Sequence, residues 1–476
     1  MAKKPNKKKK VKVDEKDLIE NPIPGLIKED NEDHTLESTE PRKIVLLGSS
    51  HLASHISLHL MRLHNMQLYV IDRKDPNQIF LNPEMKNFYG DPRITTLYWS
   101  DKDFQTNFID LQRSQGTKAD IIINTINIQD EIYSEYNPLE TMNINTIFTT
   151  ALMESLRKSD WDGVLMHMST AKVYGFKSKQ STDIPKIYES FDCHPSGIKA
   201  VSRYCQELIV SRLAETYGTK YLVFRLGTLY GHFTPSDGVL NTWLRAMLTK
   251  SHVRLHGCLG SESRDFTSIF DVADFMLQLV NRNKFSKNVL NQVYNIDSNI
   301  KNETRLKNIA DAIVGFLKPY SPDSKIIRSD YRFEEERDYR EFLDCTRATT
   351  MLGYHPKVEF DVLRVLMKIP MVIAREELGL DDESLLEISI LCNKPDEQAK
   401  LRLLKKKGLN PLTDQAQQFL ENFTAGVTAK SQEIMKGNLT SMLNDKDRSE
   451  ILKKYMEEEG LSVTDISSLV TNEKIH

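Results

Sequence analysis

The residues with the clearest chemical potential lie in the stretch VLLGSSHLASHISLHL, residues 45–60. An apolar run there turns at Gly48 into a helical pattern. His51, His55 and His59 follow at intervals of four residues. Histidines spaced in this way on one helix face can chelate a metal ion. A strand-to-helix turn can also hold a phosphate group, because the first N–H groups of the helix lack intrahelical partners. The stretch therefore indicates either a metal site or a phosphate site.

A metal site at these histidines would need further ligands, and the sequence places no acidic residue or cysteine close to them. The apolar stripe of the helix falls on Leu52, Ile56, Leu60 and Leu63. A stripe of this width packs against a core and leaves the histidines on the flanks of the helix. We therefore expect no metal ion.

The composition excludes several classes of protein. The chain has 476 residues, enough for two or three domains, and a net charge of only −3, which argues against general nucleic-acid binding. It contains neither an apolar run of membrane-spanning length nor an N-terminal secretory signal. Its five cysteines form no C-x-x-C pair, which favours reduced thiols over disulfides or a zinc site. We expect an intracellular, cytoplasmic protein that does not contact a membrane.

The first 41 residues read as a disordered tail of basic and then mixed charge. Seven lysines stand among the first twelve residues, and little apolar periodicity follows. The lysines could solubilise the chain, contact nucleic acid, or direct the protein to the nucleus.

Residues 42–375 alternate between strand-like and helix-like segments. Runs such as KIVLLG, ADIIINTI and KYLVFRLG are almost continuously apolar, as is typical of strands covered on both faces. Helix-length segments such as NTIFTTALMESLRKS separate most of them. This alternation predicts an α/β fold with a doubly wound parallel sheet and right-handed crossovers.

Residues 376–476 read as an α-helical C-terminal extension. Pro395 and Thr413 are plausible helix starts, and Gly408 and Gly460 are plausible stops. The extension carries no chemical motif. We expect it to dock on its own domain or on a protein partner.

Four motifs in the middle segment carry residues that could hold or transform a ligand. Gly48 follows the first strand, and Asp72 ends the second strand in VIDR. Thr170 lies in MSTAKVYG, and Arg264 lies in HGCLGSESRDFTSIFDVADFM. With FRLGTLYG and DCTRATTMLGYHPKVEF, these motifs in this order resemble the extended short-chain dehydrogenases/reductases over residues 43–370. The resemblance is to their NAD-dependent epimerase/dehydratase family, which acts on nucleotide sugars.

The resemblance implies roles for individual residues. Gly48 would permit the tight cofactor turn, and Asp72 would bind the ribose of NAD while repelling the 2′-phosphate of NADP. Thr170 stands at the catalytic hydroxyl position. Arg264 matches an arginine that contacts the diphosphate of a nucleotide or nucleotide sugar.

The resemblance also implies an architecture. The sheet would be Rossmann-like, with a small C-terminal substrate subdomain built roughly from residues 232–262 and 300–370. Family members often dimerise through a four-helix bundle, so a homodimer is an expectation from the resemblance alone.

The sequence departs from the family at its chemical centre. The family's tyrosine and lysine, spaced as Y-x-x-x-K, are replaced by Lys199 and Arg203 in KAVSR, and a different register places Ser196 at the tyrosine position. In the cofactor loop, His51 stands where the second glycine lets the backbone approach the pyrophosphate, and Ser54 replaces the third glycine.

Lys199 has three interpretations that the sequence leaves open. A like charge one helical turn away lowers a lysine pKa, so Lys199 could act as a base in place of the tyrosine. With Arg203 it could instead bind an anion, or both could serve only the surface or the packing.

The leading hypothesis is a catalytically degenerate family member, a pseudoenzyme that serves as a nucleotide- or nucleotide-sugar-binding module or as a structural subunit of a larger assembly. One alternative is an active NAD-dependent nucleotide-sugar epimerase or dehydratase with a rearranged base. The other is a nucleic-acid-associated protein that acts through its lysine-rich tail.

Overall fold

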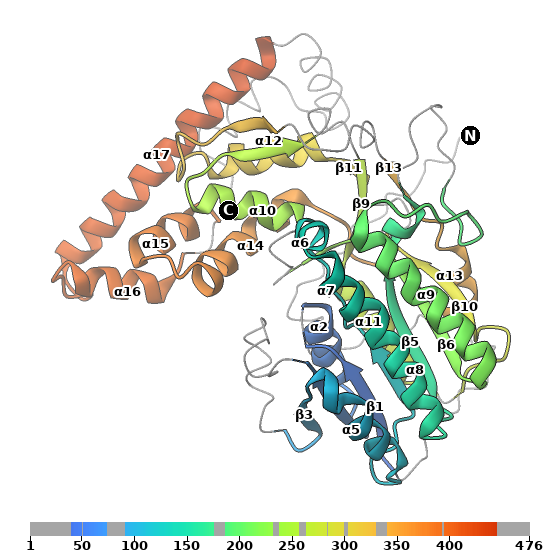
Figure 1. The fold of residues 1–476 in the computed structure, drawn as a ribbon. Coiled ribbons are helices and arrows are strands. Elements are labelled where there is room, and N and C mark those ends of the chain that lie inside the picture. The colour runs from blue at the N-terminus through green and yellow to red at the C-terminus, as the bar shows by residue number, and fades with distance from the viewer. Residues whose placement is uncertain are drawn as a thin grey trace, which may run out of the picture. The chain divides into compact units, whose positions relative to one another are not determined.

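The computed structural model describes most of the chain beyond the tail (Figure 1). The described residues are 40–49, 51–73, 91–175, 186–231, 238–256, 263–282, 284–298, 303–329, 340–392 and 395–444. The tail predicted for residues 1–41 therefore lies almost entirely outside the described residues. Gly460 and the last predicted helices lie outside them as well.

A parallel sheet of seven strands forms the centre of the fold, in the order β10-β6-β5-β4-β1-β2-β3. The strands are β1 (Arg42–Leu47), β2 (Met66–Asp72), β3 (Ile94–Tyr98), β4 (Ile121–Asn124), β5 (Val164–Thr170), β6 (Lys220–Leu226) and β10 (Gln292–Ile296). Chain order reverses on either side of β1, so the doubly wound Rossmann-like fold predicted from the sequence is confirmed.

Helices cover both faces of the sheet, which explains the continuous apolar runs of its central strands. Ile44 and Leu46 of β1 join a core with α2 (His51–Leu60) and α11 (Ile269–Val280). Val45 and Leu47 join a second core on the opposite face. The helices on that face are α5 (Asp101–Arg113), α8 (Phe148–Lys158) and α9 (Gly197–Tyr217). Side chains alternate between the two faces of a strand, so most positions of such a strand are apolar.

A smaller set of elements, which we call the helical lobe, surrounds a third core. Its members from the middle of the chain are α10 (Val239–Leu248), β8 (Val253–His256), α12 (Leu306–Leu317) and β12 (Ile326–Ser329). Its C-terminal members are α14 (Val362–Val372) with a π-helical turn (Ile373–Glu377), α15 (Asp382–Leu391), α16 (Glu397–Lys406) and α17 (Asp414–Asn444). The predicted C-terminal helical region is therefore present, and it lies beside α10 and α12 (Figure 1).

The C-terminal helices share their core with α10 and α12. Leu385 and Ile388 of α15 are buried in the same cluster as Leu244 of α10 and Ile313 of α12. The extension was expected to dock on its own domain or on a protein partner. Its described part packs on its own chain.

Short strands and turns connect the helical lobe to the sheet. Strand β9 (Ser263–Ser268) pairs with β7 (Thr228–Tyr230), β11 (Glu303–Arg305) and β13 (Arg340–Glu341). The remaining short elements are α6 (Glu131–Tyr136), α7 (Pro138–Met142), a π-helical turn (Asn143–Ile147), a 3₁₀ turn (Ala171–Tyr174) and α13 (Thr346–Leu352).

Both predicted helix starts can be compared directly. Thr413 precedes α17, and its hydroxyl accepts a hydrogen bond from the amide of Ala416 at 3.4 Å. Pro395 does not open α16. The N-cap is the next residue, Asp396, whose carboxylate accepts from the amides of Gln398 and Ala399.

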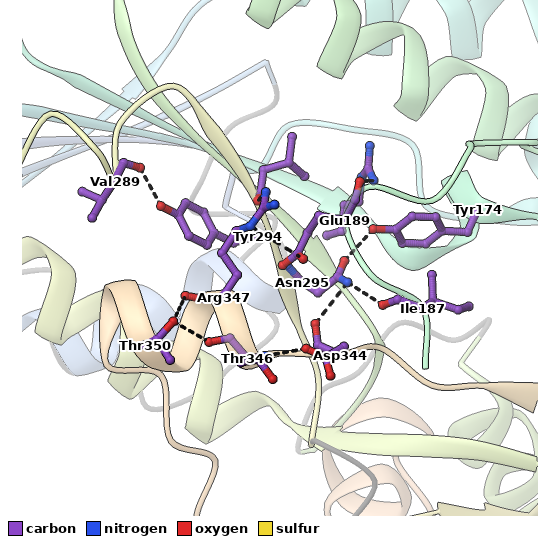
Figure 2. A network of polar contacts seen from close by, with 12 residues as sticks. Tyr174, Ile187, Glu189, Val289, Tyr294, Asn295, Asp344, Thr346, Arg347 and Thr350 are labelled. Atoms are coloured by element: carbon purple, nitrogen blue, oxygen red, sulfur yellow. Dashed lines mark hydrogen bonds and ion pairs between the residues drawn. The ribbon is translucent and has the colours of Figure 1, made fainter. Parts of the chain in front are cut away.

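A buried polar network holds the segment that leads into α9 (Figure 2). Asn295 of β10 is fully buried, and its side-chain oxygen accepts a hydrogen bond from the Tyr174 hydroxyl at 2.7 Å. Its side-chain nitrogen donates to the carbonyl oxygens of Ile187 and Asp344, and its backbone amide donates to the Glu189 carboxylate. One amide thus ties three chain segments to the end of the sheet.

Replacing Asn295 with Asp should lower the free energy of unfolding by about 2 to 4 kcal/mol. The substitution keeps the shape of the side chain. It replaces the buried amide nitrogen, which donates to two carbonyl oxygens, with a carboxylate oxygen that can only accept. Urea denaturation measures the loss. Asn308→Asp is the matched control, because Asn308 is exposed in the first turn of α12, where a carboxylate is tolerated. Equal stability of the two variants would contradict the prediction.

Candidate functional site

A cavity of about 840 Å³ lies at the carboxyl ends of β4, β5 and β6, facing α10, β8 and β9. Ligands of doubly wound sheets bind at this edge, where the strand order reverses. Five of the predicted site residues line the cavity together: His51, Thr170, Lys199, Arg203 and Arg264. Gly48 and Asp72 are not among the lining residues.

The turn after β1 requires glycine at position 48. Gly48 has a φ of +102°, which L side chains rarely adopt. A Cβ atom there would lie 2.4 Å from the hydroxyl oxygen of Thr125. That hydroxyl donates to the carbonyl of Leu47 at 2.7 Å, so it is held in place. The sequence predicted a turn at Gly48. The ends of β1 and β4 pack so closely there that only glycine fits.

Asp72 joins the end of β2 to this turn. One of its carboxylate oxygens accepts hydrogen bonds from both the backbone amide and the hydroxyl of Ser49, each at 2.7 Å. The carboxylate predicted to bind a ribose thus lies beside the turn that would hold a pyrophosphate, as a dinucleotide site requires.

Two of the three histidines of α2, His55 and His59, contact α11. The rings of His51 and His55 lie edge to face with centroids 5.4 Å apart, and the His55 ring meets Phe270 of α11 at 5.2 Å. His59 Nε2 lies 3.4 Å from a carboxylate oxygen of Asp274 on the same helix. His55 and His59 therefore form part of a helix–helix interface.

The expectation that the histidines flank the buried stripe is wrong for two of them. His51 is 3% exposed and His55 is 1% exposed, as buried as the leucines of the stripe. For His55 the reason is that α11 packs against α2 and its Phe270 meets the histidine ring. Within the described part of the chain, no group of three histidine, cysteine or acidic side chains is arranged to hold a metal ion.

Lys199 and Arg203 occupy one face of α9, one turn apart, and both line the cavity. Arg203 is 5% exposed. Its Nη2 donates to the carbonyl oxygen of Met168 in β5, and its buried Nη1 has no hydrogen-bond partner among the described residues. Burial lowers the pKa of Arg203 to about 10, which leaves the guanidinium charged at neutral pH.

Thr170 ends β5 on the same wall of the cavity. Its hydroxyl oxygen accepts a hydrogen bond from the backbone amide of Lys172 at 3.3 Å, so its own proton remains available to a ligand. Lys172 also lines the cavity. A hydroxyl donor and three cationic side chains therefore share this wall.

The described tyrosines do not replace the missing phenol. Tyr230 is the single tyrosine among the described lining residues, and its hydroxyl lies 3.5 Å from the carbonyl of Glu359. Tyr174 donates to Asn295 inside the fold. Tyr188 is 45% exposed and stacks on Phe191. Tyr204 packs against the core on the α2 and α11 side rather than lining the cavity.

Sequence reasoning missed a buried histidine close to Arg203. His167 of β5 is fully buried, and its Nδ1 accepts a hydrogen bond from the side-chain amide of Asn124 at 3.2 Å. Burial and the neighbouring Arg203 lower the pKa of His167 to about 3, so the ring is neutral. Its strand, VLMHMST, is otherwise almost continuously apolar, so the sequence pattern indicated a buried strand and gave no sign of a functional histidine.

His167 should make the protein less stable in mild acid. Its folded pKa lies below the ordinary value of 6.5, so unfolding takes up a proton as the pH falls through 6.5. This stabilisation is present above pH 6.5 and decreases by about 2 kcal/mol between pH 7 and pH 5. Urea denaturation of His167→Gln across this range should show a shallower pH dependence than the unchanged protein.

Exposed His64 provides the matched control for this experiment. His64→Gln should retain the pH dependence of the unchanged protein. Parallel pH profiles for the unchanged protein and His167→Gln would show that His167 is not the responsible group.

Comparisons with known proteins agree with the fold. The putative UDP-glucose 4-epimerase of Methanocaldococcus jannaschii is 24% identical over 326 residues, which cover 66% of this chain and 93% of that protein. The dTDP-glucose 4,6-dehydratase of Haemophilus influenzae is 23% identical over 202 residues, 41% of this chain and 56% of that protein.

Solved structures show the same fold at lower identity. DesIV, a dTDP-glucose 4,6-dehydratase from Streptomyces venezuelae with NAD bound, matches with a TM-score of 0.59 and 18% identity, covering 71% of this chain and 98% of that one. The UDP-glucuronic acid 4-epimerase of Bacillus cereus, also with NAD, matches with a TM-score of 0.56 and 20% identity, covering 67% and 95%.

No described helix is long and apolar enough to cross a membrane. Residues 45–297, more than half of the chain, match the model of the NAD dependent epimerase/dehydratase family. With the sheet order, the turn at Gly48 and the cavity at the carboxyl ends of the strands, this match shows that the chain belongs to that family.

Proposed function

We propose that the protein binds a nucleotide or nucleotide sugar in this cavity without catalysing the epimerase or dehydratase chemistry of its relatives. The observation that carries the proposal is that Lys199 and Arg203 both line the cavity. The resemblance in sequence assigns these two residues to the positions of the family's tyrosine and lysine. Arg203 is already bonded to the backbone of β5, and no phenol stands beside Thr170 among the described lining residues.

The cavity is suited to a phosphorylated ligand. Its volume of about 840 Å³ falls within the usual range for small-molecule sites. Arg254 of β8 and Arg264 of β9 stand on the side opposite Lys199 and Arg203. Guanidinium groups bind phosphate oxygens with geometric specificity. Relatives are named as enzymes of UDP-glucose and dTDP-glucose, whose common element is a nucleotide diphosphate.

The residues present fit one half of NAD. The turn at Gly48, the N-terminus of α2 and the carboxylate of Asp72 would hold its adenosine and pyrophosphate. Bound NAD supplies hydride transfer in enzymes of this kind. The buried ring of His51 lines the cavity at the start of α2, and the nicotinamide side has two cations in place of the tyrosine–lysine pair.

The proposal includes two further roles, contact with other proteins and contact with nucleic acid. The helices α14–α17 and the lysine-rich tail could contact other proteins or nucleic acid in a larger assembly. An assembly role is part of the proposal, because a protein that binds a nucleotide without turning it over can still bind its partners differently with and without the nucleotide.

Isothermal titration calorimetry of the full chain with UDP, UDP-glucose, dTDP-glucose and NAD should show binding of at least one nucleotide diphosphate. Assays for epimer and dehydration products should show no turnover at saturating ligand and NAD. Turnover that disappears in Lys199→Met or Thr170→Val would instead support the active enzyme with a rearranged base. Failure of the whole panel to bind would favour a purely structural subunit.

Arg264→Gln should weaken nucleotide diphosphate binding by about 10-fold or more, because hydrogen bonds to charged groups contribute about 1.5 to 3 kcal/mol. Arg212→Gln is the matched control. Arg212 is 74% exposed on α9, where it pairs with Glu215. Equal affinity of the two variants for the nucleotide diphosphate would show that Arg264 does not contribute to binding.

A further inference from the structure

Helix α9, which carries Lys199 and Arg203 of the cavity lining, begins without a cap from its own segment. The first N–H groups of a helix have no partners inside the helix, and a side-chain oxygen of the preceding residue usually accepts from one of them. Ser196 holds that N-cap position, but its side chain makes no capping hydrogen bond. The first turn of α9 also contains no acidic residue. A cap must therefore come from another segment.

Glu135 of α6 supplies the missing acceptor. Its Oε1 accepts a hydrogen bond from the backbone amide of Ile198, in the first turn of α9, at 2.7 Å. A carboxylate at this end of a helix is also stabilised by the positive end of the helix dipole. Donor and acceptor are 63 residues apart in the chain. The contact therefore ties two separate helices together at the end of α9 that carries Lys199.

Gly197 makes room for this carboxylate. Its φ is +80°, in the left-handed region that favours glycine. A Cβ atom at this position would lie 2.7 Å from Oε1 of Glu135, closer than Cβ atoms approach other groups in folded proteins. A larger residue at position 197 would push the carboxylate away from the Ile198 amide. The glycine on α9 and the acid on α6 therefore belong to one contact.

Helix α6 has little apolar burial to hold it in place. Among its six residues, Ser134 is the buried one, and Ile132 and Tyr136 are 56% and 67% exposed. The helix packs on α7 and α9. Most helices in proteins are stabilised by packing an apolar face, so a helix with so little of it depends on its polar contacts. The bond from Ile198 to Glu135 is such a contact between α6 and α9.

The two helices joined in this way supply lining of opposite charge. Asp130 and Glu131 line the cavity from the start of α6, and Lys199 and Arg203 line it from α9. Glu135 itself is not among the described lining residues. The Glu135 contact therefore bears on the separation of an acidic and a cationic part of the lining without reaching the cavity.

We propose that Glu135 is a positioning residue for nucleotide binding. It holds the first turn of α9 against α6 and thereby fixes the backbone that carries Lys199. Without the contact, this turn must be ordered when the ligand binds, and the cost of ordering lowers the affinity. The inference rests on the proposed function, because the affinity concerned is that of the same cavity for a nucleotide.

Charge and position predict opposite effects for this residue. Removing a carboxylate close to the cavity takes away a repulsion, so by charge alone it strengthens the binding of an anionic nucleotide. Loosening the first turn of α9 weakens the binding. Glu135→Gln removes the charge but keeps a side-chain oxygen that can accept from the Ile198 amide. Glu135→Ala removes both the charge and the acceptor.

Calorimetry of the full chain with UDP and dTDP measures the difference. Glu135→Ala should weaken the binding of the nucleotide by about 5-fold, the effect of losing one helix cap. Glu135→Gln should bind within about 2-fold of the unchanged protein. Glu215→Ala is the matched control, since Glu215 is 72% exposed near the other end of α9 and pairs with Arg212. Unchanged or tighter binding by Glu135→Ala, or an equal loss in Glu135→Gln, would contradict the proposal.

Hydrogen–deuterium exchange of the ligand-free chain tests the position of α9 without a nucleotide. Glu135→Ala should speed the exchange of amides in α6 and in residues 197–203, because these segments open locally. The amides of β5 and β6 should exchange as in the unchanged protein. Faster exchange in the two strands as well would show a general loss of stability and would overturn the positioning role.

Failure of this inference can be told apart from failure of the proposed function. Absence of binding by the unchanged protein, with UDP and dTDP alike, would count against the proposed function. Exchange would still report on the first turn of α9 in that case. Unchanged exchange of residues 197–203 in Glu135→Ala would overturn the inference whether or not a nucleotide binds.

Discussion

The buried ion pair between Glu207 and Arg225 is the interaction on which the site depends. Arg225 of β6 binds the carboxylate of α9 through two nitrogens, and both side chains are about 95% buried. Arg225 also stacks over the ring of Tyr174 at 4.7 Å, and Tyr174 in turn donates to Asn295. Removing one partner from such a network leaves an uncompensated buried charge. The pair therefore fixes α9, β6 and the end of β5 relative to one another.

This constraint decides which face of α9 meets the cavity. Glu207, Arg203 and Lys199 are spaced four residues apart, so they lie on one face of the helix. Because Glu207 is held against Arg225 and Ser169, Arg203 must lie beside β5 and Lys199 must lie near the mouth of the same cavity. Two cations are thereby placed on one wall of the cavity.

The helical lobe supplies part of the cavity lining through α10 and β8, and its core shows where the described C-terminal helices pack. The buried side chains of α14, α15 and α16 pack with those of α10 and α12. Because α10 lines the cavity, these helices support a wall of the site even though none of their own residues is among its described lining. A change in how α15 or α17 packs could therefore reach the ligand through α10 and α12.

The sequence by itself determined the parallel sheet, the order of the motifs and the identity of the residues at positions 199 and 203. Such features are local: apolar runs such as IVLL and IIIN are strands, and a glycine at position 48 marks a turn, regardless of distant segments. Tertiary structure alone decided the rest. His55 is buried because Phe270 of α11, more than 200 residues later, packs against its ring. His167 lies beside Arg203 because α9 packs on β5, and the Glu207 carboxylate is held by Arg225 of β6. Periodicity cannot reveal these pairings, since each joins groups on separate elements whose contact depends on how the elements pack.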